Sequence, residues 1–203
     1  MKKVLILFLV LLLGIIGSYT YFTQYVRRIK ISDVAPPIDK NREAKVLSAF
    51  FGLDEMPIPV LFLYLSGIGK NGMPLVFSQE IDPSTLDNRD FVVTTKNGEK
   101  YDVEFVTLKP AEEEFELRTI LFIGEYGSHP DNPPVSVEIV GDLMTRSGQN
   151  YKGQIVDVIP LPDGPTISYA EYFAFDKDYP YVAKGAGCDC PREETSLVVR
   201  TVW

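Results

Sequence analysis

The sequence is poor in the residues from which most catalytic and metal centres are built. It has one histidine, His129, and two cysteines, Cys188 and Cys190, among 203 residues. Zinc enzymes generally use two or three histidine ligands, so a single histidine argues against that class. A Ser/His/Asp relay would have to use Ser128 and Asp131 from the same proline-rich loop, where neighbouring residues do not easily reach the geometry of a triad. We therefore expect no catalytic residues, no cofactor and an exposed His129, and the chain is not expected to be an enzyme.

Cations are also scarce beyond the N-terminus. The first 30 residues contain five cations and no acid, which leaves 15 cations against 28 acids in residues 31–203, a net charge of −13. A surface this acidic repels phosphate backbones and anionic lipid headgroups. Nucleic acid is therefore excluded as a partner of the folded part.

One long hydrophobic run stands at the N-terminus. After a basic start, residues 4–17 read VLILFLVLLLGIIG, and aromatic and weakly polar residues continue the run to Phe22. These 19 residues come close to the ~20 that a helix needs to cross a bilayer. The run is apolar on every side, so it does not suit the core of a small β domain. We expect a helix over residues 4–26 that projects from the domain and makes few contacts with it.

The same run also fits a secretory signal peptide. Its basic start and its apolar stretch of about 13 residues are typical of such peptides. The cleavage site is poor, because Ile16 and Ser18 stand where small residues are preferred. The cations on either side of the run do not fix its orientation in a membrane. We favour a membrane anchor with the domain outside the cytoplasm, and secretion is the alternative.

Residues 31–56 are expected to connect the hydrophobic run to the domain. Ile31–Lys40 contains two consecutive prolines, which favour an extended spacer. Asn41–Leu53 has the pattern of a short helix, with an asparagine able to cap its start and a glycine able to end it. One face of that helix would carry four apolar side chains, Val46, Leu47, Phe50 and Phe51. The sequence thus predicts one short extra helix packed on the domain.

From residue 57 onward the chain breaks into short runs rich in β-branched and aromatic residues. Glycine and proline, 15 of each in the chain, separate these runs as turns do in an all-β domain. The expected strands are Ile58–Ser66, Met73–Ser78, Asp90–Thr95, Lys100–Leu108, Phe115–Gly124, Val135–Gly141, Lys152–Ile159 and Ser196–Trp203. Strands of this number and spacing are typical of an antiparallel β-sandwich.

Two local patterns support this interpretation. Asn97-Gly98 is a strong hairpin signal, because both residues tolerate positive φ. Alternation of apolar and acidic residues over 101–105 predicts a half-buried strand, with Tyr101, Val103 and Phe105 facing the core and Asp102 and Glu104 facing solvent. A similar alternation places Val135, Val137 and Ile139 opposite Ser136 and Glu138.

Two longer stretches carry a resemblance to a known family. Pro74–Glu99 reads PLVFSQEIDPSTLDNRDFVVTTKNGE, with a strand ending in Phe-Ser, an Asp-Pro-Ser turn, an aromatic strand and a glycine-containing hairpin. It resembles the opening of the bacterial Ig-like modules found in S-layer and other surface proteins. Val137–Gly153, VEIVGDLMTRSGQNYKG, is similar to their closing part.

The resemblance covers about residues 58–160 and implies an Ig-like antiparallel β-sandwich in an extracytoplasmic setting. Such modules are typically spacers or binding units and share no catalytic residues. The sequence departs from the pattern in its extra helix, in its long C-terminal tail and in the inserted acidic run Glu112–Glu116.

Cys188-Asp-Cys190 is the most unusual local feature, with glycines before it and a proline after it that predict an exposed loop. A disulfide within this loop, disulfides to another chain, a redox-active pair, two thiolate ligands for a metal and a pair of idle thiols are all open. Thiols outside the cytoplasm tend to oxidise, so we expect an oxidised pair.

Acidic and aromatic clusters offer further candidate sites. Calcium requires several oxygens converging from loops, and the acidic candidates are Asp82, Asp87, Asp90, Asp131, Asp176 and Asp178. None has EF-hand spacing, and each also suits a solvated turn, as does the run of Glu112–Glu116. The aromatic residues Tyr169, Tyr172, Phe173, Phe175, Tyr179 and Tyr181 would form either a platform for a glycan or protein partner or part of the core.

The sequence therefore predicts four parts. Residues 1–30 form a signal peptide or signal-anchor helix, 31–56 a spacer and short helix, 57–160 the Ig-like sandwich, and 161–203 a C-terminal extension with the Cys-x-Cys loop and a final strand. The expected function is a membrane-tethered or secreted, non-catalytic module for display or binding at the cell surface. A calcium-dependent adhesion module and a carboxylate-based extracytoplasmic enzyme are the alternatives.

Overall fold

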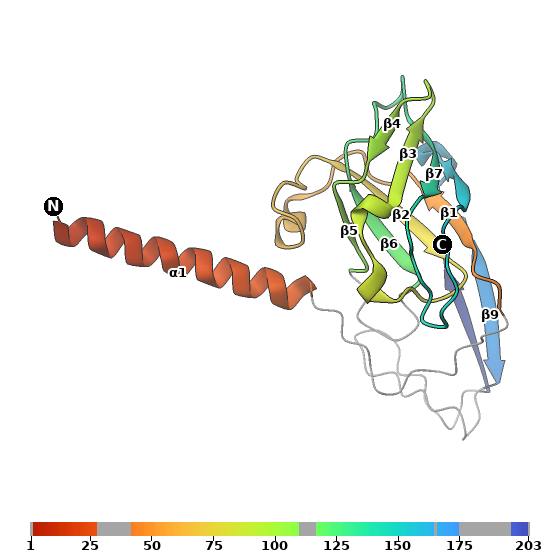
Figure 1. Ribbon diagram of the computed structural model, residues 1–203, viewed down its shortest axis with the longest axis horizontal. Helices are drawn as coiled ribbons and strands as arrows, with labels where there is room; N and C mark the ends of the chain where they lie inside the picture. The colour runs from red at the N-terminus through yellow and green to blue at the C-terminus, as the bar shows by residue number, and fades with distance from the viewer. Residues whose placement is uncertain (1, 28–41, 110–116, 165, 175–195, 203) are drawn as a thin grey trace.

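The computed structural model describes residues 2–27, 42–109, 117–164, 166–174 and 196–202. They form one long helix, α1 (Lys2–Arg27), and a mainly β domain from which the helix projects (Figure 1). Val4–Phe22 within α1 is long and apolar enough to cross a membrane, and none of this span is buried. The prediction of an apolar N-terminal helix that projects from the domain is confirmed.

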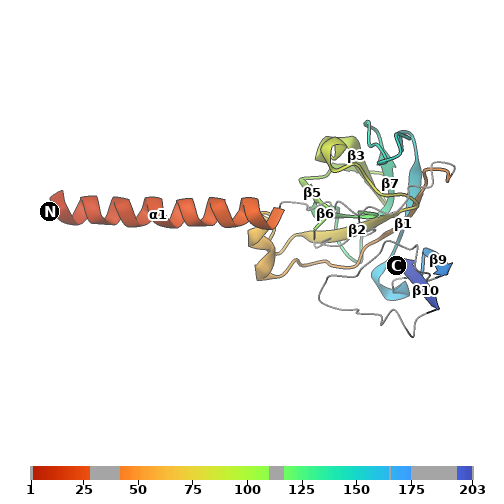
Figure 2. The same cartoon turned by 90° about the horizontal axis from the view of Figure 1, so that it is seen from below.

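Eight strands form one mixed sheet in the order β4-β3-β7-β8-β1-β2-β6-β5. Their bounds are β1 Val46–Phe50, β2 Asn71–Phe77, β3 Phe91–Thr95, β4 Lys100–Asp102, β5 Phe105–Thr107, β6 Thr119–Gly124, β7 Pro134–Ile139 and β8 Ile155–Ile159. The pairing of β1 with β8 is parallel, and every other neighbouring pair is antiparallel. The sheet curls, so that β3 and β7 stand over β2 and β6 (Figures 1 and 2).

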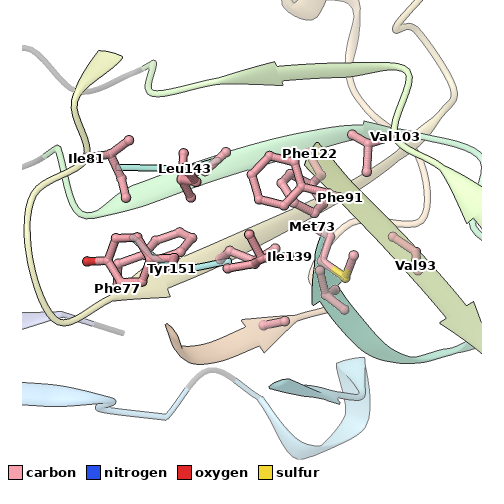
Figure 3. Packing of buried hydrophobic residues seen from close by; sticks show 14 of the residues in the cluster. Met73, Phe77, Ile81, Phe91, Val93, Val103, Phe122, Ile139, Leu143 and Tyr151 are labelled. Atoms are coloured by element: carbon pink, nitrogen blue, oxygen red, sulfur yellow. The ribbon is translucent and has the colours of Figure 1, made fainter. Parts of the chain in front are cut away.

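The concave side of the curled sheet holds a single large core. Phe91 of β3 meets Phe122 of β6 edge-to-face, with ring centroids 4.6 Å apart, so strands from opposite halves of the sheet are in contact (Figure 3). Phe77 of β2 packs in the same way on Tyr151, at 4.9 Å. Burial of these aromatic rings contributes to stability through the apolar area that they remove from water and through their edge-to-face geometry.

The predicted hairpin is found, and the predicted alternation is found in part: Val137 and Ile139 are buried, but Val135 is exposed. Gly98 has a φ of +81° at the turn between β3 and β4, a conformation that glycine adopts without strain. Val103 is buried and Asp102 and Glu104 are exposed, whereas Tyr101 and Phe105 are half-buried. The rings at these two positions lie at the short edge strands β4 and β5, where only part of each side chain can be covered.

The predicted helix over Asn41–Leu53 is wrong, because this segment contains β1. Local spacing favoured a helix, but β1 fills the gap between β2 and β8 and pairs with both. Side chains complete the pairing at its start, where the amide of Val46 donates to Oε1 of Gln154 at 2.8 Å. Tertiary pairing has here overridden a weak local preference.

The predicted strand over Ile58–Ser66 is also wrong. The segment forms a 3-10 helix, η1 (Ile58–Phe62), which follows Pro57 and contains a second proline in its first turn. Proline has no N–H to donate to a ladder, so two prolines at alternate positions prevent a central strand.

The run Lys100–Leu108 forms two strands and not one. β4 pairs with β3, and β5 pairs with β6 in the other half of the sheet. Between them the Nδ2 of Asn88 donates to the carbonyl of Val103 at 2.7 Å, which satisfies the backbone where the chain crosses over.

A separate two-stranded sheet follows the main one. β9 (Tyr169–Ala174) pairs antiparallel with β10 (Leu197–Val202) over six residue pairs. The predicted final strand is confirmed. For β9 the sequence left a strand and a short helix open, because its aromatic residues fit neither pattern, and the structure shows a strand.

Candidate functional site

The loop of the single histidine is an exposed turn. Ser128, His129 and Asp131 are all exposed, and no hydrogen bond joins their side chains within the described part of the chain. Ser128 and Asn132 exchange backbone hydrogen bonds of 3.1 and 2.7 Å, which close the loop. The buried side chain of Asn132 ties the loop to the neighbouring hairpin, accepting from the amide of Asn97 at 2.9 Å. His129 is therefore exposed, as predicted.

The acidic residues of the first calcium candidate are used by turns. The Asp82 carboxylate accepts from the amide and the hydroxyl of Ser84 at 2.9 and 2.7 Å. The Asp87 carboxylate accepts from the amide and the Nε of Arg89, both at 2.9 Å. Each thereby caps a 3-10 turn, the role that the sequence offered as an alternative to calcium. Among the described residues no three of histidine, cysteine, aspartate and glutamate gather in a way that could hold a metal.

Two neighbouring carboxyl groups of this region have pKa values shifted in opposite directions. Hydrogen bonds from Arg89 lower the pKa of Asp87 far below its ordinary value. Partial burial, with the nearby charges of Asp87 and Asp142, raises the pKa of Asp90. This is a structural ion-pair arrangement on a turn.

Part of the predicted sites lies outside the described residues. These are Cys188 and Cys190, the acidic residues Asp176 and Asp178, the run Glu112–Glu116, and the aromatic residues Phe175, Tyr179 and Tyr181. Of the remaining aromatic residues on β9, Tyr172 is exposed, and the ring of Tyr169 lies 4.9 Å from the guanidinium of Arg42 and 5.1 Å from that of Arg118. The two tyrosines therefore do not share one environment.

The contact between α1 and the domain lies in a segment that the sequence did not single out. We call residues 53–70 the apolar loop; it leads from β1 through η1 to β2. The Tyr19 hydroxyl of α1 donates to the carbonyl of Leu61 at 2.7 Å. Phe22, one turn further along α1, meets Phe62 edge-to-face with centroids 5.0 Å apart. Figure 2 shows the turn of the apolar loop beside the end of α1 that is nearer to the domain.

Backbone hydrogen bonds close the base of the apolar loop. Leu53 and Gly72 exchange backbone hydrogen bonds of 3.2 and 2.7 Å, and the amide of Met56 donates to the carbonyl of Lys70 at 2.7 Å. Inside the loop Met56 and Val60 are buried with Ile123 of β6. The loop therefore has a small core of its own that continues onto the sheet.

A polar network fixes one flank of the apolar loop to the edge of the sheet. Lys70 Nζ lies 2.8 Å from Oε1 of Glu104 and 3.6 Å from Oε1 of Glu125. The Tyr64 hydroxyl donates to Oε2 of Glu104 at 3.1 Å, and its ring stacks on Phe105 with centroids 5.0 Å apart. The hydrogen bond to Glu104 is the main cause of a raised Lys70 pKa. The loop is thus held in one position by both backbone and side chains.

Comparison with known proteins gives a limited result. No protein family matches the sequence, and no curated protein matches it either. Among solved structures, the N-terminal part of the bacterial S-layer protein SbsC aligns with 65% of this chain and 26% of its own, at 13% identity and a TM-score of 0.41. Domains 1–6 of SbsC align with 64% of this chain and 15% of their own, at 15% identity and a TM-score of 0.38. This chain spans about a quarter or less of those structures, and no function is inferred from the likeness.

Proposed function

We propose that the chain is a membrane-tethered Ig-like module, non-catalytic and used for display or binding at the cell surface. The observation that carries the proposal is α1, which has a 19-residue apolar span with no buried part at the N-terminus of a domain with its own core. An exposed helix that is apolar on all sides is unstable in water and is stabilised in lipid.

The strand order supports the Ig-like part of the proposal. In Ig sandwiches strands A, B, E and D make one sheet and C, F and G the other, to which variable-type domains add C′. In order across the sheet, β1, β2, β6 and β5 occupy the places of A, B, E and D. β8, β7, β3 and β4 occupy those of G, F, C and C′. The parallel pairing of β1 with β8 joins the two halves.

The chemistry of the described candidates supports a non-catalytic role. His129 lies exposed on a turn, and Asp82 and Asp87 are engaged as caps of turns. A partner would be a protein or a glycan, since the acidic domain repels nucleic acid.

Alkaline extraction of membranes tests the tether. The full chain is expected to stay in the membrane pellet and to keep its first 27 residues by intact mass. A matched variant with Leu9 and Leu12 replaced by arginine is expected to leave the pellet, because each charge at the middle of a membrane helix is costly. Release of the unaltered, full-length chain by alkali would contradict the tether, and recovery of a shortened chain outside the cells would identify secretion. Protease added to intact cells should digest the domain, since it is expected outside the cytoplasm.

A further inference from the structure

We infer that the apolar loop inserts into the boundary between lipid headgroups and acyl chains of the membrane that α1 spans, so that the domain rests on the bilayer. The inference rests on the proposed membrane tether. It gives the domain a second point of attachment and therefore a fixed orientation at the surface.

The exposed side of the apolar loop has the composition of a lipid-facing surface. Ile58 is 67% exposed, Leu65 64% and Ile68 48%, and Phe62 beside α1 is 39% exposed. No charged residue occurs between Glu55 and Lys70. Contiguous exposed apolar side chains on a folded domain mark an interaction site.

The contacts with α1 place the loop at the depth of the membrane boundary. Val4–Phe22 at 1.5 Å per residue measures ~28 Å, about the thickness of the hydrocarbon core. Tyr19 and Phe22 occupy the last turn of this span, and they contact Leu61 and Phe62. η1 is therefore held level with the end of the span, where aromatic residues concentrate in membrane proteins.

The conformation of the apolar loop is already fixed in the absence of lipid. Met56 and Val60 are buried on its inner side, and the Lys70–Glu104 pair with Tyr64 fixes its flank. Ile58 and Leu65 are thus presented outward without rearrangement, so little conformational entropy is lost when lipid covers them.

The distribution of charge in the domain favours lipid acyl chains, and not anionic headgroups or a protein, as what covers the apolar loop. Residues 31–203 carry a net charge of −13, so the domain is not drawn to the membrane by anionic headgroups. Contact with the bilayer must come from apolar insertion, for which the uncharged stretch between Glu55 and Lys70 is suited. A second copy of the chain or another protein would need no alignment with the end of α1.

Tryptophan fluorescence in the full chain tests this placement. Trp203 is the single tryptophan, so Trp203→Phe gives a dark background. Ile58→Trp and Leu65→Trp then report on the apolar loop, and Leu12→Trp reports on the middle of α1. Ile155→Trp is the matched control, because Ile155 is 63% exposed on β8, which lies between β7 and β1 on the far side of the domain from α1. Each variant is reconstituted in phosphatidylcholine bilayers with or without bromine on the acyl chains, and far-UV circular dichroism checks the fold.

The expected result is strong quenching by brominated lipid at Leu12→Trp, Ile58→Trp and Leu65→Trp and none at Ile155→Trp. Bromine near the carbonyl end of the acyl chain should quench the two loop reporters more than bromine near the methyl end. Quenching at Leu12→Trp with loop reporters that behave like Ile155→Trp would refute the inference and leave the tether intact. Loop reporters with blue-shifted but unquenched emission would show a protein in place of lipid, which also refutes it. No quenching at Leu12→Trp would refute the tether, and the inference with it.

Discussion

Replacing Phe91 and Phe122 by leucine, singly and together, measures whether the two halves of the curled sheet share one core. Both rings are fully buried and meet edge-to-face at 4.6 Å, one from β3 and one from β6. Each single change should cost about 1–2 kcal/mol, within the usual range for core substitutions. The aromatic contact adds about 0.5–1.5 kcal/mol beyond the buried area. The double variant should therefore be more stable than the sum of the single effects predicts, by about that amount.

Urea unfolding of the full chain in mild detergent, followed by the β signal in circular dichroism, gives the free energies. The matched control is Phe91→Leu with Val60→Ala, because Val60 belongs to the separate small core of the apolar loop. That pair should be additive within about 0.3–0.5 kcal/mol. Additivity of Phe91→Leu with Phe122→Leu would show that the halves do not pack on each other, and the sandwich interpretation would fall with it.

Three further predictions concern charge and thiols. Asp87→Asn should lower stability at pH 7 and Asp90→Asn should raise it, because the pKa of Asp87 is lowered by Arg89 and that of Asp90 is raised by burial. The stability that Asp87 contributes is present above its unfolded pKa of about 3.9 and is lost as the pH falls toward the folded pKa. The destabilisation caused by Asp90 develops as the pH rises above about 3.9. Unfolding measured between pH 7 and 3 tests both effects, and equal midpoints for the variants and the parent chain would contradict the assignment. The thermal midpoint should be the same with calcium and with chelator, since the carboxylates of Asp82 and Asp87 already accept hydrogen bonds in turns; a rise with calcium would favour the adhesion alternative. Cys188 and Cys190 should resist thiol labelling in protein taken from the cell envelope, and full labelling of both without reduction would reject the expected oxidation.

The sequence predicted those elements whose signal is local and repeated. The alternation predicted a buried Val103 between the exposed Asp102 and Glu104, and it predicted the buried Val137 and Ile139, because a slip of one residue would bury acids. The turn at Asn97-Gly98 depends on two residues that tolerate positive φ. The N-terminal helix follows from an apolar run with no polar side. In each case neighbouring residues alone carry the constraint.

β1 could not be predicted in this way, because its partners are distant in sequence. Ala49 pairs with Leu75 on one side and with Val158 on the other, more than 100 residues away. The burial of β1 does not alternate either, because the adjacent residues Ser48 and Ala49 are both buried. The helical spacing of Val46 and Phe50 was therefore a coincidence of composition.

The candidate site was missed for a related reason. Its sequence signal was present in Pro57 and Pro59, which exclude a central strand, and in the lack of charge from Met56 to Gly69. What no local pattern contains is the contact of Leu61 and Phe62 with residues about 40 positions earlier in α1.

The contact of the apolar loop with α1 bears on how the exposed side chains of the loop are interpreted. On an isolated soluble domain, Ile58 and Leu65 would be an aggregation hazard beside an otherwise acidic surface. If α1 spans a membrane as we propose, the same side chains lie where water gives way to lipid, and the lipid removes their exposure to water. Both α1 and the apolar loop thus expose apolar side chains that lipid would cover, although α1 is a long continuous helix and the loop is a turn interrupted by prolines. A tether alone would leave the domain free to tumble at the surface. The contact that we propose would add a second point of attachment and would leave β8 on the side of the domain away from the bilayer.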